Sequence, residues 1–179
     1  MLGQYFNQRD TAITSIPANW TVTGTRVDSN VDFQWGDNTP GVAGVGSDNF
    51  SVRWTGKFIP PASDNYVFYT RTDDGARLWI NGALVIDKWV VTPLTEMTST
   101  PIALTKDTPV DVRFEYFDSG GAATAQLLFS SSTISKSAIP STYLRPPGTP
   151  MAPFTATPAS ASLTVGVDPP TCYQGEVTA

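Results

Sequence analysis

The sequence predicts an all-β fold, in the form of an antiparallel β-sandwich. Segments of alternating apolar and polar residues recur along the chain and are rich in Val, Thr, Tyr, Phe and Trp. Gly, Asn, Asp and Pro separate these segments, and helical periodicity is hard to find. The 179 residues include nine Phe, six Tyr and five Trp, which is enough apolar material for the core of one domain.

Six segments have the pattern expected of strands. In the clearest of them, apolar residues alternate with Asp111, Arg113 and Glu115. Two others are separated only by Asn81-Gly82, a dipeptide that tolerates the positive φ angles of a type I′ turn and therefore predicts a hairpin. The expected strands cover residues 49–59, 66–72, 76–80, 83–87, 110–117 and 124–129.

The composition changes near Arg145, which suggests the end of a domain. We expect a β domain over residues 1–145 and a Pro-rich linker over residues 146–158, which hold five prolines. Residues 159–179 are either a tail or the start of a following β module, because 159–167 resembles a first strand. Neighbouring domains of a larger chain are therefore expected.

The composition excludes several functional classes. The chain has no histidine and one cysteine, so it has no Ser-His-Asp triad, no histidine-ligated zinc and no internal disulfide. The net charge is −5 and the basic residues are scattered, which argues against nucleic acid as a partner. No apolar run is long enough for membrane insertion. No residue pattern marks a catalytic nucleophile, and we do not expect an enzyme.

Asp73 and Asp74 are adjacent carboxylates between two expected strands. Successive side chains of an extended chain point in opposite directions, so these two converge only if the backbone bends sharply, as at a cis peptide bond. Calcium accepts six to eight oxygen ligands, including carboxylates and carbonyls. A second loop, residues 117–123, offers Asp118 and two glycines that let carbonyls turn inward. Each loop taken alone also fits an ordinary solvated turn.

The tryptophans have two possible roles, in core packing or in stacking against a sugar ring. We expect Trp35 and Trp54 to lie in the core. Trp89 follows Asp87-Lys88 after an expected strand, and its role stays open between the core and a sugar platform.

Five ordered segments resemble the PA14 domain family, a β-sandwich module. The opening Leu2–Phe6 (LGQYF) is similar to the family's first strand, and four further segments follow. They are Val31–Gly36 (VDFQWG), Asn49–Gly56 (NFSVRWTG), Asp73–Gly82 (DDGARLWING) and Ile86–Trp89 (IDKW). The resemblance extends over residues 2–145 and implies a PA14-like sandwich. Lectin members of the family hold Ca²⁺ between two aspartates joined by a cis peptide bond and a second loop, and the ion then coordinates neighbouring sugar hydroxyls.

Carried over residue by residue, this resemblance implies a calcium site and a sugar site. Asp118 takes the place that Asn or Gln usually holds. The implied metal ligands are Asp73, Asp74, Asp118 and the carbonyls of Gly120 and Ala122. The implied carbohydrate contacts are Asp73, Asp74, Asp118, Ser119 and Trp89.

The resulting expectation is calcium-dependent, lectin-type binding of a glycan or monosaccharide through vicinal hydroxyls. The parent protein would be a secreted or cell-surface adhesin, and its location extracellular. Two alternatives stay open: a non-catalytic accessory domain of a glycoside hydrolase, and a structural module without a sugar ligand.

Overall fold

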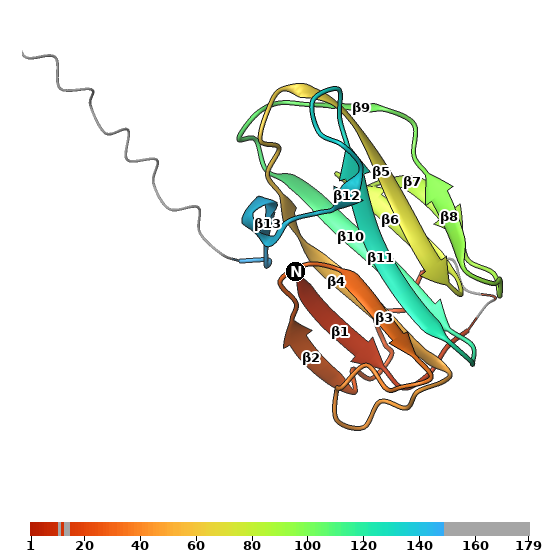
Figure 1. Cartoon of the computed structure of the whole chain (residues 1–179). Helices are drawn as coiled ribbons and strands as arrows, with labels where there is room; N and C mark the ends of the chain where they lie inside the picture. The colour runs from red at the N-terminus through yellow and green to blue at the C-terminus, as the bar shows by residue number, and fades with distance from the viewer. Residues whose placement is uncertain (11, 13–14, 149–179) are drawn as a thin grey trace, which may run out of the picture. The chain divides into compact units, whose positions relative to one another are not determined.

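A computed structural model of the chain describes residues 1–10, 12 and 15–148, and these form two stacked antiparallel β-sheets (Figure 1). The chain divides into two units, Met1–Thr149 and Pro150–Ala179, and the description below concerns the first. The expected module at 159–179 and the linker beyond residue 148 lie outside the described residues. The domain boundary near residue 145 therefore stays a prediction.

The first sheet has the strand order β2-β1-β4-β10-β6-β7, with β13 paired to β4. Its strands are β1 (Leu2–Phe6), β2 (Gly24–Val27), β4 (Phe50–Phe58), β6 (Ala76–Ile80), β7 (Ala83–Lys88), β10 (Val110–Asp118) and β13 (Leu144–Arg145).

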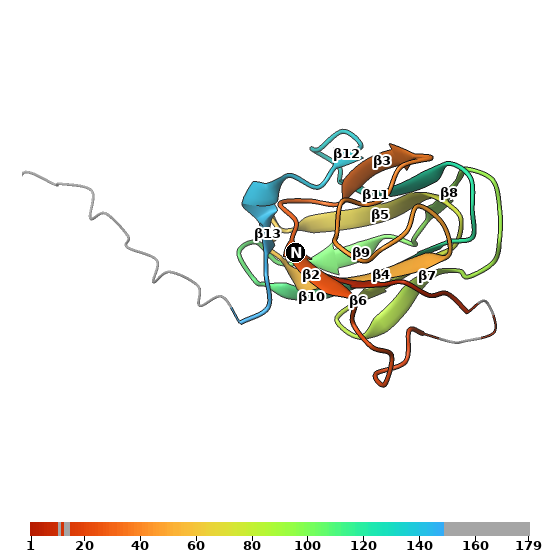
Figure 2. The same cartoon turned by 90° about the horizontal axis from the view of Figure 1, so that it is seen from below.

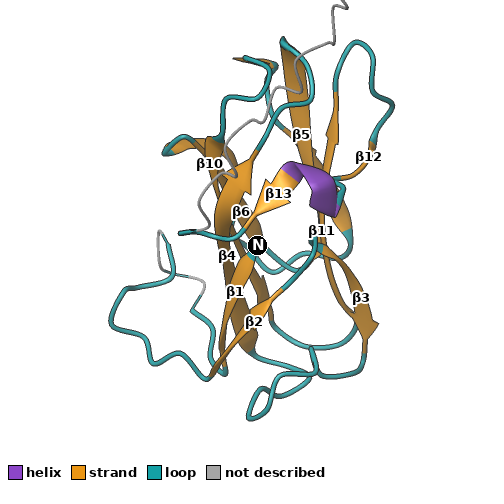
Figure 3. Cartoon of the chain, turned by 90° about the vertical axis from the view of Figure 1, so that its left-hand side faces the viewer, coloured by secondary structure: helices purple, strands orange, loops and turns teal. Residues whose placement is uncertain are grey.

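The second sheet has the order β12-β11-β5-β8, with β3 paired to β11 and β9 paired to β5. Its strands are β3 (Asp32–Gly36), β5 (Asp64–Asp73), β8 (Thr95–Thr98), β9 (Ile102–Leu104), β11 (Ala123–Ser130) and β12 (Ser137–Ala138). One 3-10 turn, η1 (Ser141–Tyr143), precedes β13. Figures 2 and 3 show the two layers, with β11 and β3 in one and β4 and β10 in the other.

All six strands expected from the alternation are present, so the all-β sandwich is confirmed. Asn81 and Gly82 have φ angles of 48° and 79° and join β6 to β7, as the hairpin prediction requires. The alternation pattern did not indicate β1 and β3, which have five residues each, or the shorter strands β2, β8, β9, β12 and β13. A strand of two to four residues is too short to show a period of two.

The core between the sheets is aromatic. Trp54 and Phe114 are fully buried on the inner face of the first sheet, and their rings stack with centroids 5.4 Å apart. Trp35 of β3 is half-buried and stacks on Trp54 from the other sheet, with the ring planes 9° apart. Both tryptophans therefore pack in the core, as expected.

A second, smaller apolar cluster lies apart from this core. It consists of Phe6, Ile16, Trp89 and Phe117, with Trp20 packed against it. The backbone N–H of Ile16 donates to the buried Glu115 carboxylate at 2.8 Å, and Arg53 pairs with the same carboxylate at 2.8 Å. These contacts fasten the segment between β1 and β2 to the sheet. Within the described residues, no helix has the length and apolar character needed to cross a membrane.

Candidate functional site

Four chain connections that pass from one sheet to the other meet at one end of the sandwich. They are β3–β4, β5–β6, β7–β8 and β10–β11, at the lower right of Figure 1. The strand registers explain this meeting. Phe50, at the start of β4, pairs with Asp118 at the end of β10, and Ala76, at the start of β6, pairs with both Tyr116 and Lys88. Residues that are distant in sequence therefore gather in one group of loops.

The β5–β6 connection carries Asp73 and Asp74, and the peptide bond between them is cis. Asp74 is buried, and both of its carboxylate oxygens accept backbone hydrogen bonds. Oδ1 accepts from Thr92 at 2.9 Å and Oδ2 from Ser119 at 2.7 Å. Asp74 thus ties the β7–β8 and β10–β11 connections to its own.

Asp73 is less enclosed than Asp74. Its carboxyl pKa is raised, first because partial burial disfavours the charge and second because Asp74 is negative, while a backbone hydrogen bond from Leu94 opposes the shift. The hydroxyl of Tyr116 donates to the Asp73 carbonyl oxygen and holds the backbone there. The backbone at Asp73 is therefore held in place, and its side chain is partly exposed.

Asp118 is the most unusual group at this end of the sandwich. It is 0% exposed, and neither carboxylate oxygen has a hydrogen bond of ordinary length and angle among the described residues. Burial raises its pKa to about 7, and the negative charges of Asp74, Asp48 and Asp73 add to the shift. A weak interaction with the backbone N–H of Asn49 opposes the shift in part. A buried carboxylate without a partner is costly, and a hard divalent cation is one group that satisfies two such oxygens. The Asp118 oxygens are therefore of the chemical type that the calcium ion implied by the family resemblance takes as ligands.

Asp48, in the β3–β4 connection, is a site residue that the sequence analysis missed. Its Oδ1 accepts a hydrogen bond from the backbone N–H of Gly121 at 3.1 Å, and its charge raises the pKa of Asp118. In the sequence it is one more surface aspartate in a loop. Only the pairing of β4 with β10 places it beside the β10–β11 loop.

These four aspartates carry concentrated negative charge. None of them takes part in the ion pairs found among the described residues. As they stand, no three acidic, histidine or cysteine side chains in the described part of the chain are close enough together to hold a metal ion. Coordination by several of them therefore requires side-chain adjustment.

The β10–β11 loop supplies the remaining expected ligands. Gly120 and Gly121 have φ angles of 150° and 86°, which favour glycine, and Ala122 is exposed beside them. Ser119 contacts the site through its backbone N–H, which donates to Asp74. The carbonyls of Gly120 and Ala122 as ligands stay predictions.

Trp89 lies near this end but is not open to a ligand. It is 4% exposed, its ring packs on Phe117 at 4.8 Å, and the Arg77 guanidinium lies over it at 4.9 Å. Its indole N–H donates to the carbonyl of Asp10. Trp89 therefore has the packing role and not the sugar-stacking role. The expectation that it contacts a sugar is wrong, because its ring is covered.

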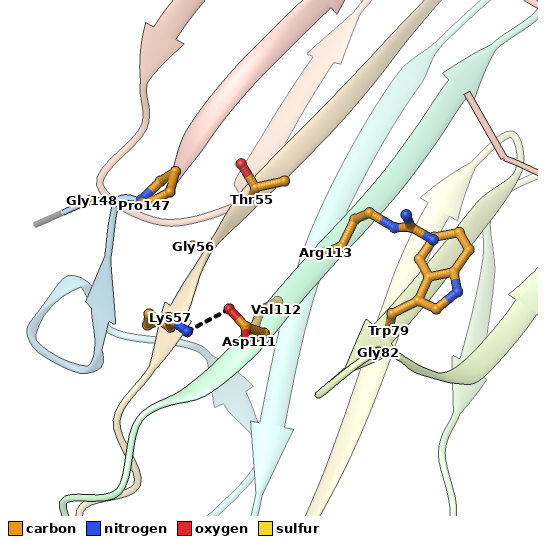
Figure 4. A pocket seen from close by; sticks show the side chains of 10 residues that line it. All are labelled: Thr55, Gly56, Lys57, Trp79, Gly82, Asp111, Val112, Arg113, Pro147 and Gly148. Atoms are coloured by element: carbon orange, nitrogen blue, oxygen red, sulfur yellow. Dashed lines mark ion pairs between the residues drawn. The ribbon is translucent and has the colours of Figure 1, made fainter. Parts of the chain in front are cut away.

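A separate pocket of about 400 Å³ lies on the first sheet near the start of β10 (Figure 4). Lys57 pairs with Asp111 at 2.6 Å across it, and the Arg113 guanidinium lies 3.7 Å from the centre of the Trp79 ring. Asp111 precedes Asp118 by seven residues, which is ~23 Å along a strand. The pocket and the carboxylate group are therefore distinct. The residues that line the pocket are Thr55, Gly56, Lys57, Trp79, Gly82, Asp111, Val112, Arg113, Pro147 and Gly148.

The fold and the aspartate pair define a PA14 domain. The profile of the PA14 domain family matches residues 3–143, and the chain belongs to that family.

Among proteins of known role, the chain is 41% identical over 149 residues to the anti-sigma-I factor RsgI3 of Acetivibrio thermocellus. The match covers 83% of this chain and 22% of that protein. A solved anti-sigma factor domain-containing protein has 41% identity and a TM-score of 0.74, over 84% of this chain and 49% of that one. This chain therefore spans only part of these relatives.

The PA14 sugar-binding domain of an RTX adhesin has the same fold. Its TM-score is 0.65 at 21% identity, and the match covers 79% of this chain and 95% of that domain. At this identity the likeness concerns the fold.

Proposed function

We propose that this chain is a calcium-dependent carbohydrate-binding module that recognises vicinal sugar hydroxyls. The single observation that carries the proposal is the Asp118 carboxylate, which is fully buried, has no hydrogen bond of ordinary geometry and is influenced by three other carboxylates. A structural turn would bury an apolar or hydrogen-bonded residue at this position. A divalent cation satisfies these oxygens and neutralises the surrounding charge.

The residues that would hold the ion come from two loops. Asp73, Asp74 and Asp118 offer carboxylate oxygens, and Gly120 and Ala122 offer carbonyls. A bound calcium ion supplies open coordination positions that two neighbouring hydroxyls of a sugar can fill.

The protein groups have different tasks in this arrangement. The backbone N–H groups of Thr92 and Ser119 orient the Asp74 carboxylate from both sides. Asp73 is partly exposed and accepts a hydrogen bond from a sugar hydroxyl, and a bond to a charged acceptor contributes roughly 1.5–3 kcal/mol. Asp48 holds the second loop in place through Gly121.

Titration calorimetry tests the proposal in two stages. The first measures calcium binding, and the second measures, in the presence of calcium, the binding of glycans that were first identified on a glycan array. We expect Asp73→Asn and Asp74→Asn to abolish glycan binding and weaken calcium binding, with the fold retained. Asp111→Asn is the matched control, since this carboxylate is 66% exposed and lies at the pocket of Figure 4. Glycan binding that survives excess chelator, or survives both site variants, contradicts the proposal.

The same experiment separates the remaining alternatives. Calcium binding without any glycan supports a structural module in which the ion joins two loops. Glycan binding is compatible with an adhesin and with an accessory domain of a glycoside hydrolase. We retain an extracellular or cell-surface location as part of the proposal, because calcium sites of lower affinity can be used there.

The relatives favour one further setting for the module. The anti-sigma-I factor RsgI3 and a solved anti-sigma factor domain-containing protein are each 41% identical to this chain. We therefore propose, as a second candidate, that this domain is the ligand-recognition part of such a regulatory protein. Reading the gene on both sides of these 179 residues tests it: a sigma-binding domain supports the regulatory setting, and tandem β repeats support adhesion.

A further inference from the structure

The β7–β8 connection exposes a group of aliphatic side chains, Val90, Val91 and Leu94, which we call the apolar rim. Their exposed fractions are 46%, 58% and 43%. Among the described residues, only Val22, Val27 and Leu84 are other large apolar side chains with comparable exposure. Three of these six exposed side chains thus lie within five residues of one loop, and grouped apolar exposure marks binding surfaces.

The apolar rim is fastened to the proposed calcium site. The backbone N–H of Thr92 donates to Asp74 Oδ1 at 2.9 Å, and the backbone N–H of Leu94 bonds to Asp73. The Thr95 hydroxyl donates to the carbonyl of Pro93 at 2.6 Å, which closes the loop on itself. The backbone that carries the rim is therefore held beside Asp73 and Asp74.

The chemistry of this border differs from that of the carboxylates. Of the side chains from Val90 to Leu94, only that of Thr92 is polar, and its hydroxyl already contacts that of Thr95 at 3.3 Å. A sugar hydroxyl placed against the rim would lose water and gain no equivalent partner, which is unfavourable. A methyl group placed there would bury apolar surface, which is favourable.

We propose that the apolar rim is a specificity subsite for the methyl group of a 6-deoxyhexose whose ring diol occupies the carboxylate site. This inference rests on the proposed function. The carboxylates require a diol, and the rim distinguishes a sugar that ends in methyl from one that ends in hydroxymethyl. Burial of one methyl group corresponds to a preference of about fourfold.

Two matched sugar pairs test the inference in saturating calcium. L-Fucose and L-galactose differ only in the hydroxyl at carbon 6, and so do L-rhamnose and L-mannose, so calorimetry measures the methyl effect for two diol positions. We expect the 6-deoxy sugar to bind at least about fourfold more tightly in at least one pair. We expect Val91→Ser, alone and with Val90→Ser, to reduce that ratio toward one while calcium affinity stays unchanged.

Val27→Ser is the matched control, since Val27 is 64% exposed on β2, away from the site. It should leave both the ratio and the calcium affinity unchanged. Equal binding within both pairs, or a ratio that rim variants do not change, overturns this inference while the calcium-dependent lectin function stands. Calcium binding with no binding of any sugar on the array overturns both.

Discussion

Replacing Asp118 by Asn should have opposite effects on folding and on calcium binding. Asp118 is fully buried without a hydrogen bond of ordinary geometry, and its pKa is about 7 instead of the ordinary 3.8. The amide has nearly the shape of the carboxylate but carries no charge. The calcium-free variant should therefore be more stable than the parent protein, whereas a charged oxygen ligand is lost.

The magnitude follows from the pKa of Asp118. A rise from 3.8 to about 7 at roughly 1.4 kcal/mol per unit opposes folding by up to ~4 kcal/mol when the carboxyl is ionised at pH 8. The buried Asn amide itself costs about 1–3 kcal/mol, so the net gain is roughly 1–3 kcal/mol. For a domain of this size, that raises the melting temperature by about 5 °C. We expect calcium affinity to fall at least about tenfold.

Thermal melting at pH 8 in chelator and calcium calorimetry measure the two effects on one sample. Asp111→Asn is again the control, and its stability should change by less than about 0.5 kcal/mol because that carboxylate is 66% exposed. A calcium-free Asp118→Asn protein that melts below the parent, or one that binds calcium with parental affinity, would refute the reasoning.

Three further predictions concern pH and packing. Without calcium, the free energy of unfolding should fall as pH rises from about 4 to 7, because the raised pKa of Asp118 lets the folded state hold a proton that the unfolded state has lost. Melting temperatures in chelator that do not change over this pH range would contradict this. Gly75→Ala should destabilise by about 1–3 kcal/mol in urea unfolding, because its Cβ would lie 2.3 Å from the Phe117 ring, and parental stability would refute the contact. Glu115→Ala should cost about 3–5 kcal/mol, because it leaves the mostly enclosed Arg53 guanidinium without its 2.8 Å partner, and a loss under 1 kcal/mol would show the pair to be weak.

Local sequence determined most of the sheet framework. The alternation in 50–58 and 110–117 reflects strands with one face in the core, and that periodicity is visible without any partner strand. Asn81-Gly82 predicts the hairpin between β6 and β7, because the geometry of the turn depends on these two residues alone. Asp73, Asp74 and Asp118 were identifiable as candidates because they are carboxylates at the ends of such strands.

The rest of the site was decided by tertiary structure. Asp48 lies beside Gly121 only because Phe50 pairs with Asp118, and that register joins segments 68 residues apart. The burial of Trp89 depends in the same way on a loop that precedes β2. Burial, hydrogen-bond partners and the resulting pKa shifts are properties of neighbours in space, and a residue's neighbours in sequence do not determine them.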